Sequence, residues 1–240
     1  MDAKTRSTLR WLPRTCLVIR IHGWLAVALA WSVVIYGIAR FTFPDFYNFA
    51  NCQACPLPVL LVIVPATLFF VVDFKADRFN NPGAWVYCVL LVSVSNAVFH
   101  TCTRDGIPVS MFCMSLLMFI IYTATGVVCA RWARCLYVCY FLCIVVALTL
   151  VGVYAKTFIV TAVIYAILHI ILQITIGAEM YYNLKLAPLI RTNSGSLLLY
   201  FLFIILYEMS IITWTSELRF SILKHLSSSS VNATATNSSG

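Results

Sequence analysis

The stretch SLLLYFLFIILYEMSIITWT, residues 196–215, decides the class of this protein, because it is apolar enough to cross a lipid bilayer. The hydrocarbon core of a bilayer is about 30 Å thick, and a helix that spans it needs roughly 20 mostly apolar residues. Glu208 is the one charged residue in the stretch, and it lies well inside it. The stretch therefore predicts a transmembrane helix that carries a single acid.

The composition of the whole chain agrees with this prediction. Apolar residues make up 62% of the chain and charged residues only 10%, and the mean hydropathy is +0.95. A soluble domain carries about 25% charged residues, which solvate its surface. The 240 residues correspond to one domain by length. We therefore expect an all-α membrane protein that has the lipid bilayer as a partner, because helices in lipid satisfy their own backbone hydrogen bonds.

Six further apolar segments lie outward from residues 196–215, and together they predict a seven-transmembrane helix bundle. The predicted spans are 21–39, 57–72, 84–99, 107–130, 135–154, 157–182 and 196–215. The second and third spans are short, so each needs tilt or polar flanks. The bundle fills residues 21–215, between a basic segment 1–20 and a Ser/Thr/Asn-rich tail 216–240. Segment 1–20 lacks a short apolar region with a cleavage site, so we expect the first span to act as the insertion signal.

The formal charge of +8 indicates topology, because the basic residues lie between apolar segments and form no nucleic-acid-binding patch. With the N-terminus in the cytoplasm, that side holds eleven basic residues: Lys4, Arg6, Arg10, Arg14, Arg20, Lys75, Arg78, Arg131, Arg134, Lys185 and Arg191. The opposite side holds five: Arg40, Arg104, Lys156, Arg219 and Lys224. Because cytoplasmic loops carry the excess of Lys and Arg, this split predicts a cytoplasmic N-terminus and a lumenal or extracellular C-terminus.

The C-terminal tail gives an independent indication of the same orientation. Residues 227–240 are uncharged and rich in Ser, Thr and Asn, which is typical of disorder. They contain two N-glycosylation sequons, at Asn232 and Asn237. Sequons are modified only on the lumenal or extracellular side, so the tail predicts a glycoprotein with its C-terminus outside.

Glu208 is the strongest candidate for a functional residue. An acid in the middle of a transmembrane helix costs about 2.5–3.5 kcal/mol on insertion scales, so such an acid usually faces the interior of a bundle. Loss of water favours the neutral acid unless a cation or a base lies nearby. Two roles stay open: an ion or proton site, or a neutral carboxyl that bonds to a neighbouring helix.

His169 and Gln173 are candidate partners of Glu208. They are four residues apart, hence on one face of the predicted sixth span. Counting from the helix ends places His169 within about one or two turns of Glu208 in depth. The pattern predicts either a Glu208–His169 pair or polar residues that join two helices, and the second interpretation is favoured.

Cys52 and Cys55 form a Cys-x-x-Cys pair in the first outer loop, and Cys102 lies in the second. No histidine accompanies the pair, which argues against a zinc site. On an oxidising side of the membrane, a disulfide between Cys102 and one of the pair is expected ahead of a redox-active pair.

Catalytic and cofactor signatures are absent from the sequence. It has no Gly-rich phosphate loop, no His-Glu-x-x-His and no nucleophile elbow. Ser93, Ser95 and Asn96 are polar residues of the third span, where such residues commonly join helices without chemistry. We therefore expect no enzyme, cofactor or metal.

Two short motifs resemble the Bax-inhibitor-motif superfamily of seven-helix membrane proteins. The sequence YNLKL, residues 182–186, is similar to the aromatic-Asp-Thr-Gln-Leu motif that closes the sixth helix of that superfamily. The sequence LYE, residues 206–208, is similar to its Leu-x-Leu-Asp region in the seventh helix. The seven-helix plan, the length and the Cys- and aromatic-rich spans look most like the cytomegalovirus seven-transmembrane branch, which is related to the cellular proteins. The topology resembles this branch throughout, and the motifs cover about the last third.

The resemblance implies a Bax-inhibitor-like bundle and a candidate ion or proton site at Glu208, Asn183 and His169. In the cellular relatives, two membrane acids form a pH-sensitive latch that controls calcium leak, because two close carboxyls share protons. Here the first position is Asn183, which cannot titrate, and Glu179 lies one turn earlier and out of register. This departure argues against a latch of two carboxyls.

Several viral relatives resemble adaptors that alter the trafficking or surface level of host immune ligands and so dampen natural killer cell recognition. Our first hypothesis is therefore a viral multi-pass protein of host membranes, from the endoplasmic reticulum to the plasma membrane. It would act on host membrane proteins, with related viral seven-transmembrane proteins as further partners. The alternative is a calcium or cation leak channel that moderates cell death. An orphan seven-helix receptor is disfavoured, because the third span ends in HTCT, residues 100–103, and the seventh lacks Asn-Pro-x-x-Tyr.

Overall fold

The computed structural model describes residues 3–44, 61–100, 103, 106–131, 159–186, 188 and 191–213, and this part of the chain contains helices and no strand. Its elements are α1 (Ala3–Thr42), α3 (Ile63–Phe74), η3 (Arg78–Asn80), α4 (Pro82–Phe99), α5 (Ile107–Arg131) and α7 (Ile159–Lys185). A further helix, Thr192–Thr213, follows α7. We call Thr192–Thr213 the central helix.

Four helices of the described part are long and apolar enough to cross a membrane. They are Arg14–Thr42 within α1, Pro82–Phe99, Ile107–Val128 and Thr192–Thr213. These helices confirm apolar membrane-length segments at the predicted first, third, fourth and seventh spans. The predicted second span meets only the shorter apolar helix Ile63–Phe74.

The other two predicted spans stay predictions. The predicted sixth span coincides in large part with α7, which has 27 residues. The predicted fifth span, 135–154, lies outside the described residues. The predicted seven-span count therefore stays an expectation, while the all-helical fold is confirmed for the described part.

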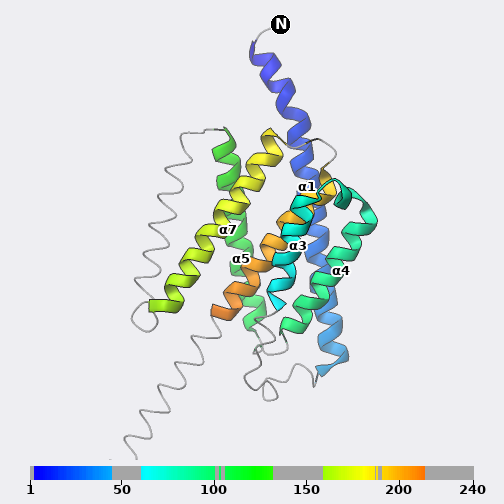
Figure 1. Cartoon of the computed structure of the whole chain (residues 1–240), viewed down its shortest axis with the longest axis vertical. Helices are drawn as coiled ribbons and strands as arrows, with labels where there is room; N and C mark the ends of the chain where they lie inside the picture. The colour runs from blue at the N-terminus through cyan, green and yellow to red at the C-terminus, as the bar shows by residue number, and fades with distance from the viewer. Residues whose placement is uncertain are drawn as a thin grey trace, which may run out of the picture.

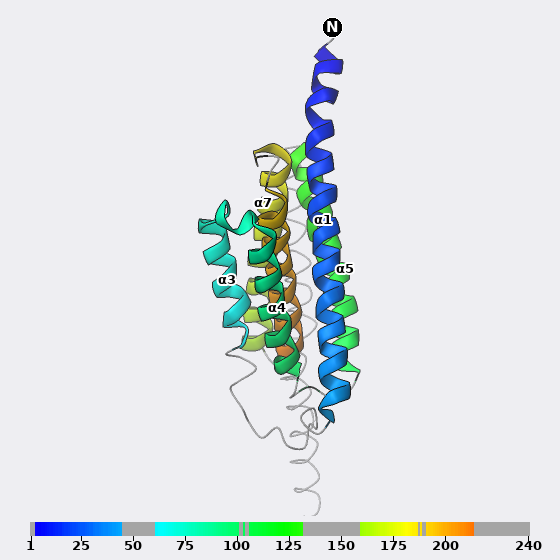
Figure 2. The same cartoon turned by 90° about the vertical axis from the view of Figure 1, so that its right-hand side faces the viewer.

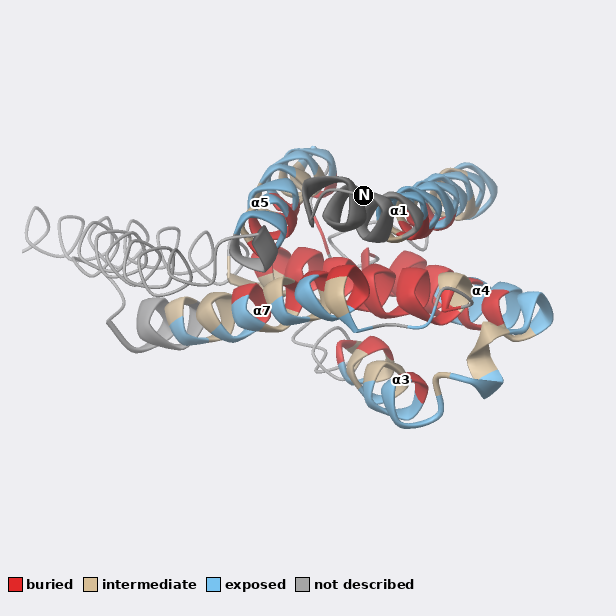
Figure 3. Cartoon of the chain, turned by 90° about the horizontal axis from the view of Figure 1, so that it is seen from above, coloured by how far each residue is buried: buried red, intermediate tan, exposed pale blue. Residues whose placement is uncertain are grey.

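The helices form three layers around the central helix. Seen along the bundle, α4 and α7 flank the central helix on opposite sides and form the middle layer with it (Figure 3). A second view shows α1 and α5 on one side of this layer and α3 on the other (Figure 2). The central helix thus lies among all the other described helices.

The central helix is interior because its sequence is apolar on every side. In its apolar stretch 83% of the residues are buried, against 22% for α1 and 28% for α5. Consecutive residues from Leu197 to Ile204 are almost fully buried. A helix that is hydrophobic all round belongs in a core, whereas α1 and α5 leave most of their apolar side chains for lipid.

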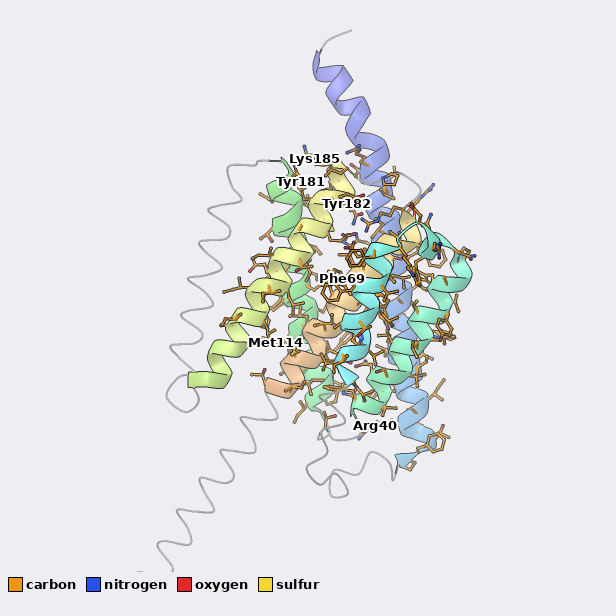
Figure 4. The ribbon with its side chains drawn as sticks, in the orientation of Figure 1. Arg40, Phe69, Met114, Tyr181, Tyr182 and Lys185 are labelled. Atoms are coloured by element: carbon orange, nitrogen blue, oxygen red, sulfur yellow. The ribbon has the colours of Figure 1, made fainter. Side chains whose placement is uncertain are left out.

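The two ends of the bundle gather different residues. At one end, Arg14 donates a hydrogen bond to the carbonyl of Leu184 (3.2 Å), and Asn193 bonds to Asn80. Here α1 lies beside the end of α7, and η3 lies beside the start of the central helix; we call this the basic end. Lys185 marks the basic end and Arg40 lies at the opposite end (Figure 4).

The opposite end is built around His100, and we call it the His100 end. The ring of His100 lies 5.2 Å from that of Tyr36 on α1 and 5.2 Å from that of Tyr207 on the central helix. Tyr207 also donates a hydrogen bond to the carbonyl of Pro108 (3.1 Å). The end of α4 and the start of α5 therefore meet here.

The closest helix contact lies between α5 and α7, where two glycines face each other. A Cβ placed on Gly126 would lie 2.8 Å from the Cβ of Met180 and 3.0 Å from the Cα of Gly177. A Cβ placed on Gly177 would lie 3.9 Å from the Cα of Gly126, its nearest neighbour, and one placed on Gly23 would meet nothing within 4 Å. Small residues commonly allow such close approach in membranes.

We expect Gly126→Ala to destabilise the protein by about 1–3 kcal/mol, because the new methyl group would force α5 away from α7. Gly23→Ala is the matched control and should be neutral or slightly stabilising, because alanine favours a helix by about 1 kcal/mol over glycine. Gly177→Ala should fall between them. Denaturant unfolding in mixed micelles measures all three. Equal effects at Gly126 and Gly23 would contradict the close packing.

Candidate functional site

The polar side chains in the first half of the central helix bond to two neighbouring helices. The hydroxyl of Tyr200 lies 2.6 Å from that of Ser32 on α1 and 3.1 Å from that of Ser93 on α4. The two serine hydroxyls are 2.9 Å apart. One turn earlier, Trp85 of α4 donates to the hydroxyl of Ser196 (2.9 Å). These bonds fix α1 and α4 against the central helix.

The second half of the central helix packs mainly on α5 through aromatic rings. Phe203 lies 5.5 Å from both Phe112 and Phe119, measured between ring centroids. Ser115 donates a long hydrogen bond (3.4 Å) to Ser210 of the central helix. The interior is therefore closed by aromatic packing and short polar contacts.

Glu208 is fully buried in the His100 half of the bundle. Neither of its carboxyl oxygens has a hydrogen-bond partner among the described residues. The same holds for both ring nitrogens of His100, for the side-chain oxygen of Asn96 and for the hydroxyl of Ser95. An unsatisfied buried polar group costs about 1–3 kcal/mol, and more when it is charged. This half therefore holds several polar groups that have no hydrogen-bond partner among the described residues.

His169 forms a hydrogen bond with a residue of α5. Its Nδ1 atom is 2.8 Å from the hydroxyl of Tyr122 on α5, and Tyr122 follows Phe119, which contacts the central helix, by one turn. Neither carboxyl oxygen of Glu208 has a partner among the described residues, so no hydrogen bond joins Glu208 to His169 in this structure. Tyr122–His169 joins α5 to α7, which agrees with the interpretation of His169 as a residue that joins helices.

Asn183 is also placed away from Glu208. Its amide nitrogen donates to the carboxyl of Glu179 (3.1 Å), and its side-chain oxygen lies near Gly195 at the start of the central helix. Glu208 is thirteen residues beyond Gly195 in the same helix, which corresponds to about 20 Å along the axis. The structure therefore does not bring Asn183, His169 and Glu208 together as one site.

The basic end holds an ionic cluster that the sequence did not reveal. Arg191 is buried just before the central helix, and its guanidinium bonds to the carboxyl of Glu179 at 3.1 Å. It also lies 3.6 Å from the carboxyl of Asp73 and 4.6 Å over the ring of Tyr182. One arginine thus links α3, α7 and the central helix. The signal available in the sequence was an acid in the last turns of an apolar segment, at Glu179.

The remaining predicted site residues lie outside the described part of the chain. These are Cys52, Cys55 and Cys102 of the expected disulfide, and Asn232 and Asn237 of the sequons. The cysteines that the structure describes with free thiols are Cys16, Cys88 and Cys113. Within the described ranges, no group of three or more His, Cys, Asp or Glu side chains is arranged to hold a metal ion.

Comparison with known proteins gives a partial viral similarity. The chain is 26% identical over 111 residues to the uncharacterized protein HVLF4 of human cytomegalovirus (strain AD169). The match covers 46% of this chain and 35% of that protein, so the chain spans about a third of the length of this relative. No known family model matches the sequence, and no solved structure matches it. The similarity supports a relationship to cytomegalovirus proteins.

The two acids of the ionic cluster should differ in their effect on stability. Glu179 is only 10% exposed and lies closer to Arg191, whereas Asp73 is 54% exposed. Glu179→Gln should cost about 3–5 kcal/mol, because it leaves the buried cation of Arg191 without its main counter-charge. Asp73→Asn should cost about 1 kcal/mol or less. Unfolding in mixed micelles measures both.

A double variant provides the control for this prediction. Replacing Glu179 and Arg191 together by Met removes both buried charges, so it should recover most of the stability that Glu179→Gln loses. Equal losses for Glu179→Gln and Asp73→Asn would contradict the ranking of the two ion pairs.

Proposed function

We propose that this chain is a viral multi-pass membrane protein that binds host membrane proteins and changes their trafficking or surface level. The similarity to a cytomegalovirus protein supports the viral origin, and the four apolar helices support residence in a bilayer. By this proposal the target proteins include ligands that natural killer cells recognise.

The observation that carries the proposal is the closed packing of the central helix. Its aromatic and aliphatic side chains are buried on every side, and Ser196, Tyr200 and Tyr207 bond to neighbouring helices. Such an interior acts as a scaffold. Partner proteins would then bind to the loops and to the outer faces of the helices, where Trp24 and Trp31 of α1 are exposed. Faces of this kind can pack against transmembrane helices of a partner.

We further propose seven spans in a Bax-inhibitor-like arrangement, with the basic end in the cytoplasm and the C-terminal tail outside. The gathering of Lys75, Arg78, Lys185 and Arg191 near the basic end supports this orientation, because cytoplasmic loops carry the excess of basic residues. The position of Arg40 at the other end agrees with the predicted minority of basic residues outside (Figure 4).

A cation or proton leak is the second candidate function, and Glu208 is the residue that favours it. Its carboxyl is buried and unpartnered among the described residues, which is unusual for a purely structural acid. Against this candidate, no second carboxyl lies with it in the part of the chain that the structure describes: Glu179 bonds to Arg191 at the basic end. Because no such pair is found among the described residues, we rank the leak below the scaffold.

Quantitative surface proteomics tests the proposal. Cells that express the chain should lose, or gain, at least one host membrane protein at their surface by several-fold relative to cells that express a truncated chain without the central helix. Co-purification of the affected protein with the full chain should follow. An unchanged surface proteome in infected cells that lack only this chain would contradict the proposal.

A calcium-leak measurement separates the two candidates. Under the scaffold proposal, Glu208→Gln should leave both store calcium leak and partner binding unchanged, because the variant keeps the size and the buried position of the side chain. Tyr200→Phe is the matched control, since it alters a polar group of the same helix and spares the acid. A leak in the wild type that Glu208→Gln abolishes and Tyr200→Phe keeps would reverse the ranking.

A further inference from the structure

We propose that the basic end of the bundle, together with the first turns of α1, binds the headgroups of anionic phospholipids. The inference goes beyond the proposed function, because it assigns a lipid ligand and involves no host protein. It rests on the length of α1, on the register of its arginines and on the distribution of charge at the basic end.

The helix α1 is too long to lie within the membrane. It has 40 residues, which correspond to about 60 Å, whereas the hydrocarbon core is about 30 Å thick. The predicted first span begins at residue 21, so the earlier residues of α1, Arg14 among them, lie beyond it. The first turns of α1 extend clear of the other described helices (Figures 1 and 2). The helix therefore continues through the membrane surface without a break.

The arginines of this extension lie in register with the face of α1 that packs on the bundle. Arg6, Arg10 and Arg14 are spaced by four residues, which places them along one side of the helix. Leu17 and Ile21 continue the same side and are buried in the core. Arg14 itself bonds to the end of α7. Positions 6 and 10 therefore lie on the side of α1 that overhangs the basic end.

The basic end has more cations than its acids can neutralise. The described acids at this end are Asp73, Asp77 and Glu179, and the buried Arg191 engages Asp73 and Glu179. Seven further basic residues lie at this end and on the extension, namely Lys4, Arg6, Arg10, Arg14, Arg20, Lys75 and Arg78. Like charges at this density repel one another, so an anion among them would be stabilising.

A lipid headgroup is the anion that this position favours. Arg14 and Arg20 lie just before the predicted span 21–39, in the part of α1 that is closest to the lipid phosphates. Clusters of four to eight basic residues beside a transmembrane helix typically attract anionic lipids. An acidic protein segment could offer the same charge, but it would not be held at this depth.

The test uses the purified full chain in phosphatidylcholine vesicles that contain either spin-labelled phosphatidylserine or spin-labelled phosphatidylcholine. We expect the chain to associate preferentially with phosphatidylserine, and we expect added salt to reduce the preference. The double variant Arg6→Gln/Arg10→Gln should lower phosphatidylserine association by up to about fivefold per arginine, which is about 1 kcal/mol each. Its fold should be unaffected, because both positions lie beyond the bundle.

Arg40→Gln is the matched control, because it removes one cation at the opposite end of α1 (Figure 4). It should keep the preference for phosphatidylserine. Equal association with the two lipids, or an equal loss in Arg40→Gln, would overturn the inference. The inference would also be overturned if the chain bound an acidic peptide and that peptide displaced no phosphatidylserine. The lipid experiment tests only this inference, and surface proteomics tests only the proposed function. Either one can therefore fail without the other.

Discussion

Protein surrounds the central helix on every side, and the positions of the other described helices depend on that burial. Lipid tails are as apolar as leucine, so a membrane gives helices no hydrophobic reason to associate. Tight packing and interhelical hydrogen bonds must hold the helices together instead. The central helix takes part in many of these contacts. Tyr200 alone contacts α1 and α4 through its hydroxyl, and Phe203 contacts α5 through its ring. The outer helices need to be complementary to this one element more than to one another.

The two halves of the bundle use polar residues in opposite ways. At the basic end, charges are paired: Arg191 satisfies Glu179 and approaches Asp73, so a buried cation is neutralised where three elements meet. Toward the His100 end, Glu208 and His100 are buried without hydrogen-bond partners among the described residues. The first arrangement resists separation of the helices, and the second leaves buried polar groups without a partner among the described residues.

The sequence predicted helix locations well because the thickness of the bilayer sets a length that hydropathy can detect. It therefore located the membrane-length helices at 84–99, 107–130 and 196–215. The sequence underestimated the length of α1, since hydropathy cannot show how far a helix continues outside the apolar core.

Side-chain partners were predicted poorly, because they depend on rotation of each helix about its axis. His169 forms a hydrogen bond with Tyr122, and none joins it to Glu208 among the described residues. Asn183 bonds within its own helix to Glu179. The sequence placed Glu179 one turn before Asn183, yet its partner Arg191 was visible only as one of eleven basic residues in the topology count.

The place of the central helix in the order of synthesis has a consequence for how the protein is made. It is the last of the described helices to leave the ribosome, although the earlier ones pack around it. Until it inserts, Ser32, Ser93 and Trp85 lack the partners that it supplies. Polar groups without partners in hydrocarbon are costly. We therefore expect the earlier helices to form a loosely packed intermediate, or to contact proteins of the translocation machinery, until the central helix inserts. Tertiary structure can close only after translation of this helix is complete, which makes biogenesis the stage at which a host cell could detect or degrade the chain.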